Sequence, residues 1–100
     1  MEPGIVDAAR LFKVLSSESR LALLLLIGQE PRTVGALAAA SGLSQPLVSQ
    51  HLRTLRGAGL VAAERSGKEV SYAVADLHVS HVISDAILHV READDRSPAE

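Results

Sequence analysis

The sequence predicts a mainly α domain, of α+β class, with about five helices and one two-stranded β-hairpin. Two stretches support this prediction. From Ser44 to Arg56, apolar residues recur at i, i+4 and i+7, which is the spacing of an amphipathic helix. From Lys68 to Ala75, apolar and polar or small residues alternate, which is the spacing of a half-buried strand. Turn residues Ser66-Gly67 separate it from Leu60–Arg65, so the two segments are expected to form a hairpin.

The stretch Ser41–Leu60 contains the strongest helix signals of the chain. The Ser44 hydroxyl is expected to cap the helix start, and Pro46 follows in the first turn, where a missing N–H costs little. Gly57 and Gly59 are expected to end the helix, because glycine adopts the left-handed cap conformation. The expected buried stripe is Val48, Leu52 and Leu55.

A shorter helix is predicted just upstream, over Thr33–Ala40, with Gly42 in the connecting turn. Two helices joined by a short turn that contains glycine form a helix-turn-helix. The second helix would present its polar stripe to the major groove of DNA. That stripe consists of Gln45, Ser49, Arg53 and Arg56.

A helix-turn-helix followed directly by a hairpin is a winged helix, and Arg65 and Lys68 flank the tip of this hairpin. The segment QPLVSQHLRTLRGAGLVAAERSGKEVSYAV resembles the core of the ArsR/SmtB family of metal-sensing bacterial repressors. The resemblance covers roughly residues 7–92. It implies a homodimer that binds operator DNA as apo-protein and is released by metal.

One hundred residues allow one domain with a small core, and such domains often gain stability by dimerising. The chain has no cysteine, which excludes a disulfide scaffold and a thiolate metal site. Some family members carry a cysteine-based arsenic site on the first helix of the motif, but the matching stretch Arg32–Gly35 has no soft ligand. The longest apolar run, Leu21–Ile27, is too short to cross a membrane, and no signal peptide is visible. We therefore expect a cytoplasmic protein with no membrane partner.

The net charge of −2 hides an uneven distribution. Residues 1–40 are balanced, with four cations and four anions. Residues 41–68 hold four cations against Glu64, a balance of +3, and residues 69–100 hold two cations against seven anions, a balance of −5. Positive charge therefore lies on the motif and hairpin, where DNA phosphates are expected.

Three further helices are expected, over Ile5–Leu15, Glu18–Gly28 and Leu77–Arg91. Ile5, Ala9 and Phe12 share one face of the first, which on its own predicts a core contact; the resemblance adds a role at the dimer interface. The second is apolar on all sides from Leu21 to Ile27 and should lie at the buried centre. The domain is expected to span residues 1–92, followed by a disordered tail over residues 93–100.

Candidate metal ligands lie at both ends of the last predicted helix. Asp76 and His78 are at its start, and His89 and Glu92 are at its end. His78 and His89 lie on nearly the same face but about 16 Å apart along the axis, too far for one ion. An antiparallel second copy related by a two-fold axis would complete two four-ligand sites per dimer.

The D-x-H-x10-H-x2-E spacing of these residues resembles the carboxy-terminal-helix site of the family's zinc sensors. Nitrogen and oxygen ligands suit zinc, cobalt or nickel, and tetrahedral geometry favours zinc or cobalt. Nickel sensing in relatives can recruit N-terminal ligands, and no histidine lies near Met1. An alternative site within one helix would use His81 and Asp85, which continue the stripe of His78 and His89.

The leading functional hypothesis is a metal-responsive, homodimeric transcriptional repressor that binds an inverted-repeat operator. Gln45, Ser49 and Gln50 would read base edges from a helix that Ser44 begins, whereas cations would hold phosphates. Those cations are Arg53, Arg56, Arg65 and Lys68. The alternatives are a regulator of the same family with a non-metal signal or none, a metal buffer and a small zinc hydrolase. Four protein ligands would leave no open coordination position, so an enzyme is not expected.

Overall fold

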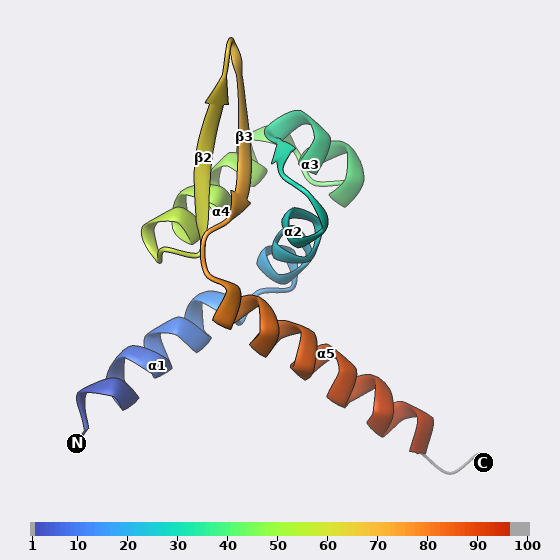
Figure 1. Ribbon diagram of the computed structural model, residues 1–100. Helices are drawn as coiled ribbons and strands as arrows, with labels where there is room; N and C mark the ends of the chain where they lie inside the picture. Colours follow the sequence, from blue (N-terminus) through green and yellow to red (C-terminus); the bar gives the residue numbers. More distant parts are fainter. Residues whose placement is uncertain (1, 97–100) are drawn as a thin grey trace.

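The computed structural model describes residues 2–96, a range that contains five helices and three strands (Figure 1). The helices are α1 (Pro3–Leu15), α2 (Glu18–Gln29), α3 (Val34–Ser41), α4 (Gln45–Gly57) and α5 (Leu77–Arg96). The strands are β1 (Arg32–Thr33), β2 (Val61–Ser66) and β3 (Glu69–Val74). The predicted five helices and hairpin are confirmed. Within residues 2–96, no helix combines the length and apolar character that crossing a membrane requires.

The hydrophobic core surrounds α2, which lies between the helix-turn-helix, the base of the hairpin and α5 (Figure 1). Leu23 and Ile27 of α2 are 0% and 2% exposed, which confirms the predicted central position of this helix. Burial of each such side chain contributes about 1.5–3 kcal/mol. The buried residues are all aliphatic: Leu15, Leu23, Leu24, Ile27, Leu37, Val48, Leu52, Leu55, Leu60, Val61, Val79 and Ile83.

The hairpin belongs to a three-stranded antiparallel sheet in the order β1-β3-β2. The sequence did not predict β1, because two residues are too few to show a strand period. In β1, Arg32 pairs with Tyr72 and Thr33 pairs with Ser71. As a result, β3 is the central strand, and at Tyr72 it pairs with β1 on one side and with β2 on the other.

The structure corrects the predicted end of α4 and the predicted hairpin turn. Gly57 is the last residue of α4, and only Gly59, with φ of 75°, takes the left-handed conformation expected after a helix end. The hairpin turn is Gly67-Lys68, not Ser66-Gly67, because Ser66 pairs with Glu69. Gly67 has φ of 64°, which suits the first position of a two-residue hairpin turn.

The two terminal helices are longer than predicted. The helix α1 begins at Pro3, where the carboxylate of Glu2 accepts a hydrogen bond from the backbone N–H of Gly4 at 2.8 Å. The helix α5 continues to Arg96, so residues 93–96 are helical and not part of a disordered tail. The rest of that predicted tail, residues 97–100, lies outside the described residues.

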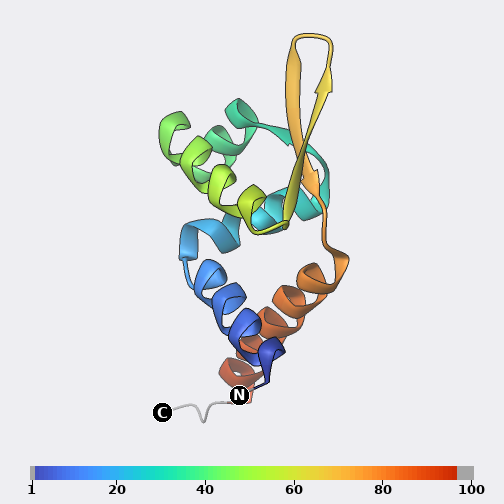
Figure 2. The ribbon, with the colours of Figure 1, turned by 90° about the vertical axis from the view of Figure 1, so that its left-hand side faces the viewer.

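Helices α1 and α5 diverge from the core and leave much apolar surface exposed (Figure 1). The exposed surface is 7050 Å², whereas a compact monomer of 10.5 kDa exposes about 5,400 Å². The predicted core contact of α1 is wrong for the single chain, because Ile5 and Phe12 are 55% and 57% exposed. Ala9 is exposed as well. Figure 2 shows that both helices project away from the hairpin.

Candidate DNA-binding surface and metal half-sites

The recognition-helix candidate α4 is held in place by a cap and a buried stripe. Ser44 Oγ accepts a hydrogen bond from the N–H of Leu47 at 3.3 Å, which confirms the predicted cap. Val48, Leu52 and Leu55 are at most 1% exposed, so the rotation of α4 about its axis is fixed. The predicted DNA-contacting residues are therefore exposed along the helix: Gln45, Ser49, Gln50, Arg53 and Arg56.

The helix before it, α3, completes the helix-turn-helix. Thr33 Oγ1 accepts from the N–H of Ala36 at 3.1 Å and begins α3. Gly42, with φ of 77°, ends α3 in the left-handed conformation, and its N–H donates to the carbonyl of Ala38 at 2.9 Å. Leu37 of α3 is fully buried. This arrangement confirms the predicted motif.

Four cations on α4 and the hairpin have no ion-pair partner within residues 2–96. Neither the ion pair of Arg10 with Asp7, at 3.7 Å, nor the pair of His78 with Asp76 involves these four cations. The unpaired cations are Arg53, Arg56, Arg65 and Lys68, and each is exposed. A group of unpaired cations on one protein surface is typical of a phosphate-binding face.

Two other arginines have structural roles instead. Arg20 Nε donates to the carbonyl of Val14 at 2.6 Å, near the end of α1. Arg32 Nε donates to the carbonyl of Leu26 at 2.8 Å, near the end of α2, and its guanidinium also contacts Gln29. Both arginines satisfy carbonyls that a helix end leaves without an intrahelical partner. These two arginines therefore stabilise the fold through their hydrogen bonds.

The hairpin, or wing, extends away from the core beside α4 (Figure 1). Lys68 lies in the turn, and Arg65 pairs with Val70 one step below it. The predicted presentation of two cations near the tip is therefore confirmed. Glu64 is exposed on the same hairpin, and its partner in the register is Ser71.

A polar hollow of about 460 Å³ lies between α4 and β3. Its lining residues are Ser49, Leu52, Arg53, Arg56, Gly57 and Tyr72. The sequence predicts Ser49 and both arginines on the DNA face, but it predicts Tyr72 only as part of the strand over Lys68–Ala75. The available signal was its position on the strand, since Tyr72 shares one face of the strand with Val70 and Val74 and is the only tyrosine of the chain.

His51 is half-buried on α4. Burial lowers the pKa of His51 below its ordinary value of 6.5, and the positive charge of Arg20 on α2 lowers that pKa further. The imidazole is therefore neutral near pH 7 in the folded protein.

The free energy of unfolding should decrease as the pH falls from 7.5 to 5.5, because the unfolded chain binds a proton at His51 more readily. The contribution of neutral His51 is complete above the ordinary histidine pKa and is lost as the pH falls through the lowered value. Urea unfolding at both pH values should show a smaller decrease in His51→Gln than in the wild type. The exposed control His81→Gln should keep the wild-type decrease; equal decreases in wild type and His51→Gln would contradict the prediction.

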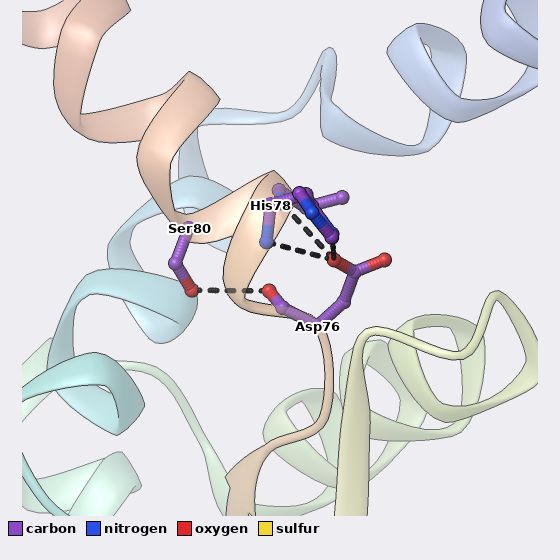
Figure 3. A network of polar contacts seen from close by, with 4 residues as sticks. Asp76, His78 and Ser80 are labelled. Atoms are coloured by element: carbon purple, nitrogen blue, oxygen red, sulfur yellow. Dashed lines mark hydrogen bonds and ion pairs between the residues drawn. The ribbon is translucent and has the colours of Figure 1, made fainter.

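The first metal half-site lies at the start of α5 (Figure 3). Asp76 Oδ1 accepts hydrogen bonds from the N–H of His78 at 3.0 Å and of Val79 at 3.2 Å, so Asp76 caps the helix. His78 Nδ1 lies 3.7 Å from the same oxygen. The hydroxyl of Ser80 donates to the carbonyl of Asp76 at 3.3 Å. The structure thus places His78 beside Asp76, and the backbone hydrogen bonds orient the Asp76 carboxylate.

The second half-site lies on the exposed side of α5, where His89 and Glu92 are one helical turn apart. Within residues 2–96, no group of three or more histidine and acidic side chains is close enough to hold one metal ion. The alternative site within one helix, with His81 and Asp85, is likewise not assembled among the described residues and stays an alternative prediction. Each end of α5 offers two ligands, and the geometry of one chain does not join the two pairs.

A helix-turn-helix and wing with unpaired cations along one side define a DNA-binding transcriptional regulator. The chain belongs to the ArsR family: the family model described as "Bacterial regulatory protein, arsR family" matches residues 17–63. The description of this family is that of regulatory proteins, which agrees with the prediction that the chain is not an enzyme.

The comparisons with individual proteins agree with this assignment. The HTH-type transcriptional repressor SmtB of Mycobacterium tuberculosis is 45% identical over 89 residues, or 88% of this chain and 66% of the relative. A probable mercury resistance operon repressor of Streptomyces lividans is 40% identical over 75% of this chain and 60% of its own length. The chain thus spans about two thirds or less of the length of these relatives.

The structural comparison agrees as well. A homodimeric winged helix-turn-helix DNA-binding domain of Mycobacterium bovis, described as a possible ArsR-family regulator, superposes with a TM-score of 0.84 at 29% identity. The match covers 96% of this chain and 89% of that domain.

Proposed function

We propose that this chain is a homodimeric repressor that binds an inverted-repeat operator and releases it when zinc or a similar divalent ion binds. The observation that carries the proposal is the separation of four candidate ligands into two pairs at opposite ends of α5. An antiparallel second copy would place Asp76 and His78 of one chain against His89 and Glu92 of the other. Each of the two sites would then have four ligands.

Dimerisation is supported by the surface that the single chain exposes. The chain exposes about 1,600 Å² more surface than a compact monomer of the same mass. A standard protein–protein interface buries about 800 Å² on each partner. The exposed apolar side chains of α1 and α5 include Phe12, Val82 and Leu88, at 57%, 43% and 55%. The Mycobacterium bovis domain with the same fold is a homodimer.

The ligand chemistry favours zinc among the possible effectors. Two imidazoles and two carboxylates suit a borderline ion, whereas mercury, named for the Streptomyces relative, prefers thiolates that this chain lacks. The backbone N–H groups that hold Asp76 Oδ1 orient its carboxylate before any ion binds. When bound, zinc would supply positive charge and tetrahedral bond directions that join the two copies.

The DNA contacts follow from the exposed side of α4 and the wing. Gln45, Ser49 and Gln50 would read base edges in the major groove, and the four unpaired cations would hold phosphates. In a dimer, two such helices would address half-sites about one helical turn apart or a multiple of it. The alternative, a regulator of the same family with a non-metal signal or none, would use the same DNA surface but no metal site.

A cobalt titration tests the metal part of this proposal. Two ions per dimer should bind and give the intense visible absorption of tetrahedral cobalt, with weaker binding at lower pH because the imidazoles must be neutral. His89→Ala should weaken binding more than tenfold, since it removes one of four ligands. The matched control His81→Ala, on the same exposed side of α5, should bind as the wild type does. Loss of binding in His81→Ala but not in His89→Ala would overturn the ligand set.

A further inference from the structure

The hollow between α4 and β3 gathers hydrogen-bond donors without a competing negative charge. Arg53 and Arg56 lie one turn apart on α4, and neither has an ion-pair partner within residues 2–96. No carboxylate lines the hollow. The acidic residue of β2 is Glu64, which pairs with Ser71. Because successive residues of a strand point to opposite faces, Glu64 and Ser71 lie on the sheet face opposite to that of Tyr72. The hollow is therefore positively charged.

Tyr72 lines this hollow from a strand whose backbone position is fixed. Its strand, β3, is paired on both sides, with Arg32 and Ala63 opposite Tyr72. The ring is half-buried and packs against the core. Within residues 2–96 the hydroxyl makes no hydrogen bond, and no buried side-chain oxygen or nitrogen in that range lacks a partner. The hydroxyl must therefore reach solvent, as is common when a tyrosine has an apolar body and a polar tip.

We infer that this hollow binds one phosphate of the DNA backbone, with Arg53 and Arg56 supplying charge and the Tyr72 hydroxyl donating a hydrogen bond. The inference rests on the proposed DNA-binding function and assigns one contact within it. A phosphate fits because it accepts several hydrogen bonds at once and carries the opposite charge. The site lies where α4 meets the wing, so a single phosphate would link the two DNA-contacting elements and fix their position on the duplex without reading sequence.

Substitution of Tyr72 separates this role from simple packing. Tyr72→Phe keeps the ring and removes only the hydroxyl, so it should lower the affinity for duplex DNA about tenfold, equally on all sequences. The slope of log affinity against log salt should not change, because no charge is lost. The matched variant Arg53→Gln should lower the affinity and also reduce the slope by about two for a dimer. Fluorescence anisotropy with a labelled duplex of mixed sequence, at several salt concentrations, gives both quantities.

A fluorine label tests the contact directly, because Tyr72 is the only tyrosine. Protein that contains 3-fluorotyrosine should give one ¹⁹F resonance, which should shift when the duplex is added and shift less in the Arg53→Gln variant at saturating duplex. Wild-type affinity in Tyr72→Phe, or an unmoved resonance while anisotropy shows binding, would overturn this assignment alone. Failure of the wild type to bind the duplex even at low salt would overturn the DNA-binding function and this assignment with it.

Discussion

Replacing Phe12 with aspartate should convert the dimer to a monomer and lower operator affinity by about 10²–10⁴-fold. Phe12 is 57% exposed on α1 and lines an apolar hollow of about 260 Å³ between α1 and α5, together with Val82. In a dimer, a buried carboxylate at this position would have no partner, and its desolvation would oppose association. A monomer binds one half-site and loses the effective concentration that the second recognition helix provides.

The exposure of Phe12 makes this variant a clean test, because the side chain contributes little to the core of the single chain. Sedimentation equilibrium should give the monomer mass for Phe12→Asp and the dimer mass for the wild type, with similar circular dichroism. The control Ala62→Asp places the same charge at an exposed position on the wing and should keep the dimer mass. A dimeric Phe12→Asp, or a wild type that is monomeric at micromolar concentration, would exclude the proposed interface.

Zinc should weaken operator binding by roughly 5–150-fold, the usual range of allosteric coupling of about 1–3 kcal/mol. The candidate ligands lie on α5 or on the residue that caps it, after the wing, and none lies on α4 or β3. Any effect on DNA must therefore act through the arrangement of the two copies. Joining the start of one α5 to the end of the other would favour a dimer in which the two α4 helices no longer fit successive major grooves. Because coupling is reciprocal, operator DNA must weaken zinc binding by the same factor.

The sequence predicted the helices and wing well because their signals are local. Ser44 caps α4 and Asp76 caps α5 with side chains whose position alone indicated the role. The strand β1 was not predicted, because two residues form a strand only when the edge of β3 is available. The hairpin turn was displaced by one residue, since the register of Ser66 with Glu69 depends on pairing along the whole hairpin.

The candidate sites could be predicted only where their residues are close together in the sequence. The ligands Asp76 and His78 are two residues apart, so their proximity could be derived from spacing, and the structure brings them together. The contribution of Tyr72 depends on how β3 lies against α4, which is a contact between segments far apart in sequence. Likewise, exposure of Phe12 follows from the direction in which α1 leaves the core, and the sequence period alone gave the wrong prediction for the single chain.

The measurement that most directly tests metal-responsive repression is operator affinity with and without zinc. Fluorescence anisotropy should be recorded at fixed ionic strength, first with a chelator and then with saturating zinc. Bound cations would by themselves favour the polyanionic DNA, so electrostatics predicts tighter binding, whereas the proposed linkage of the two α5 helices predicts weaker binding. A loss of 5-fold or more, absent in His89→Ala, is the expected result. Unchanged or tighter binding in zinc would contradict release of the operator by metal.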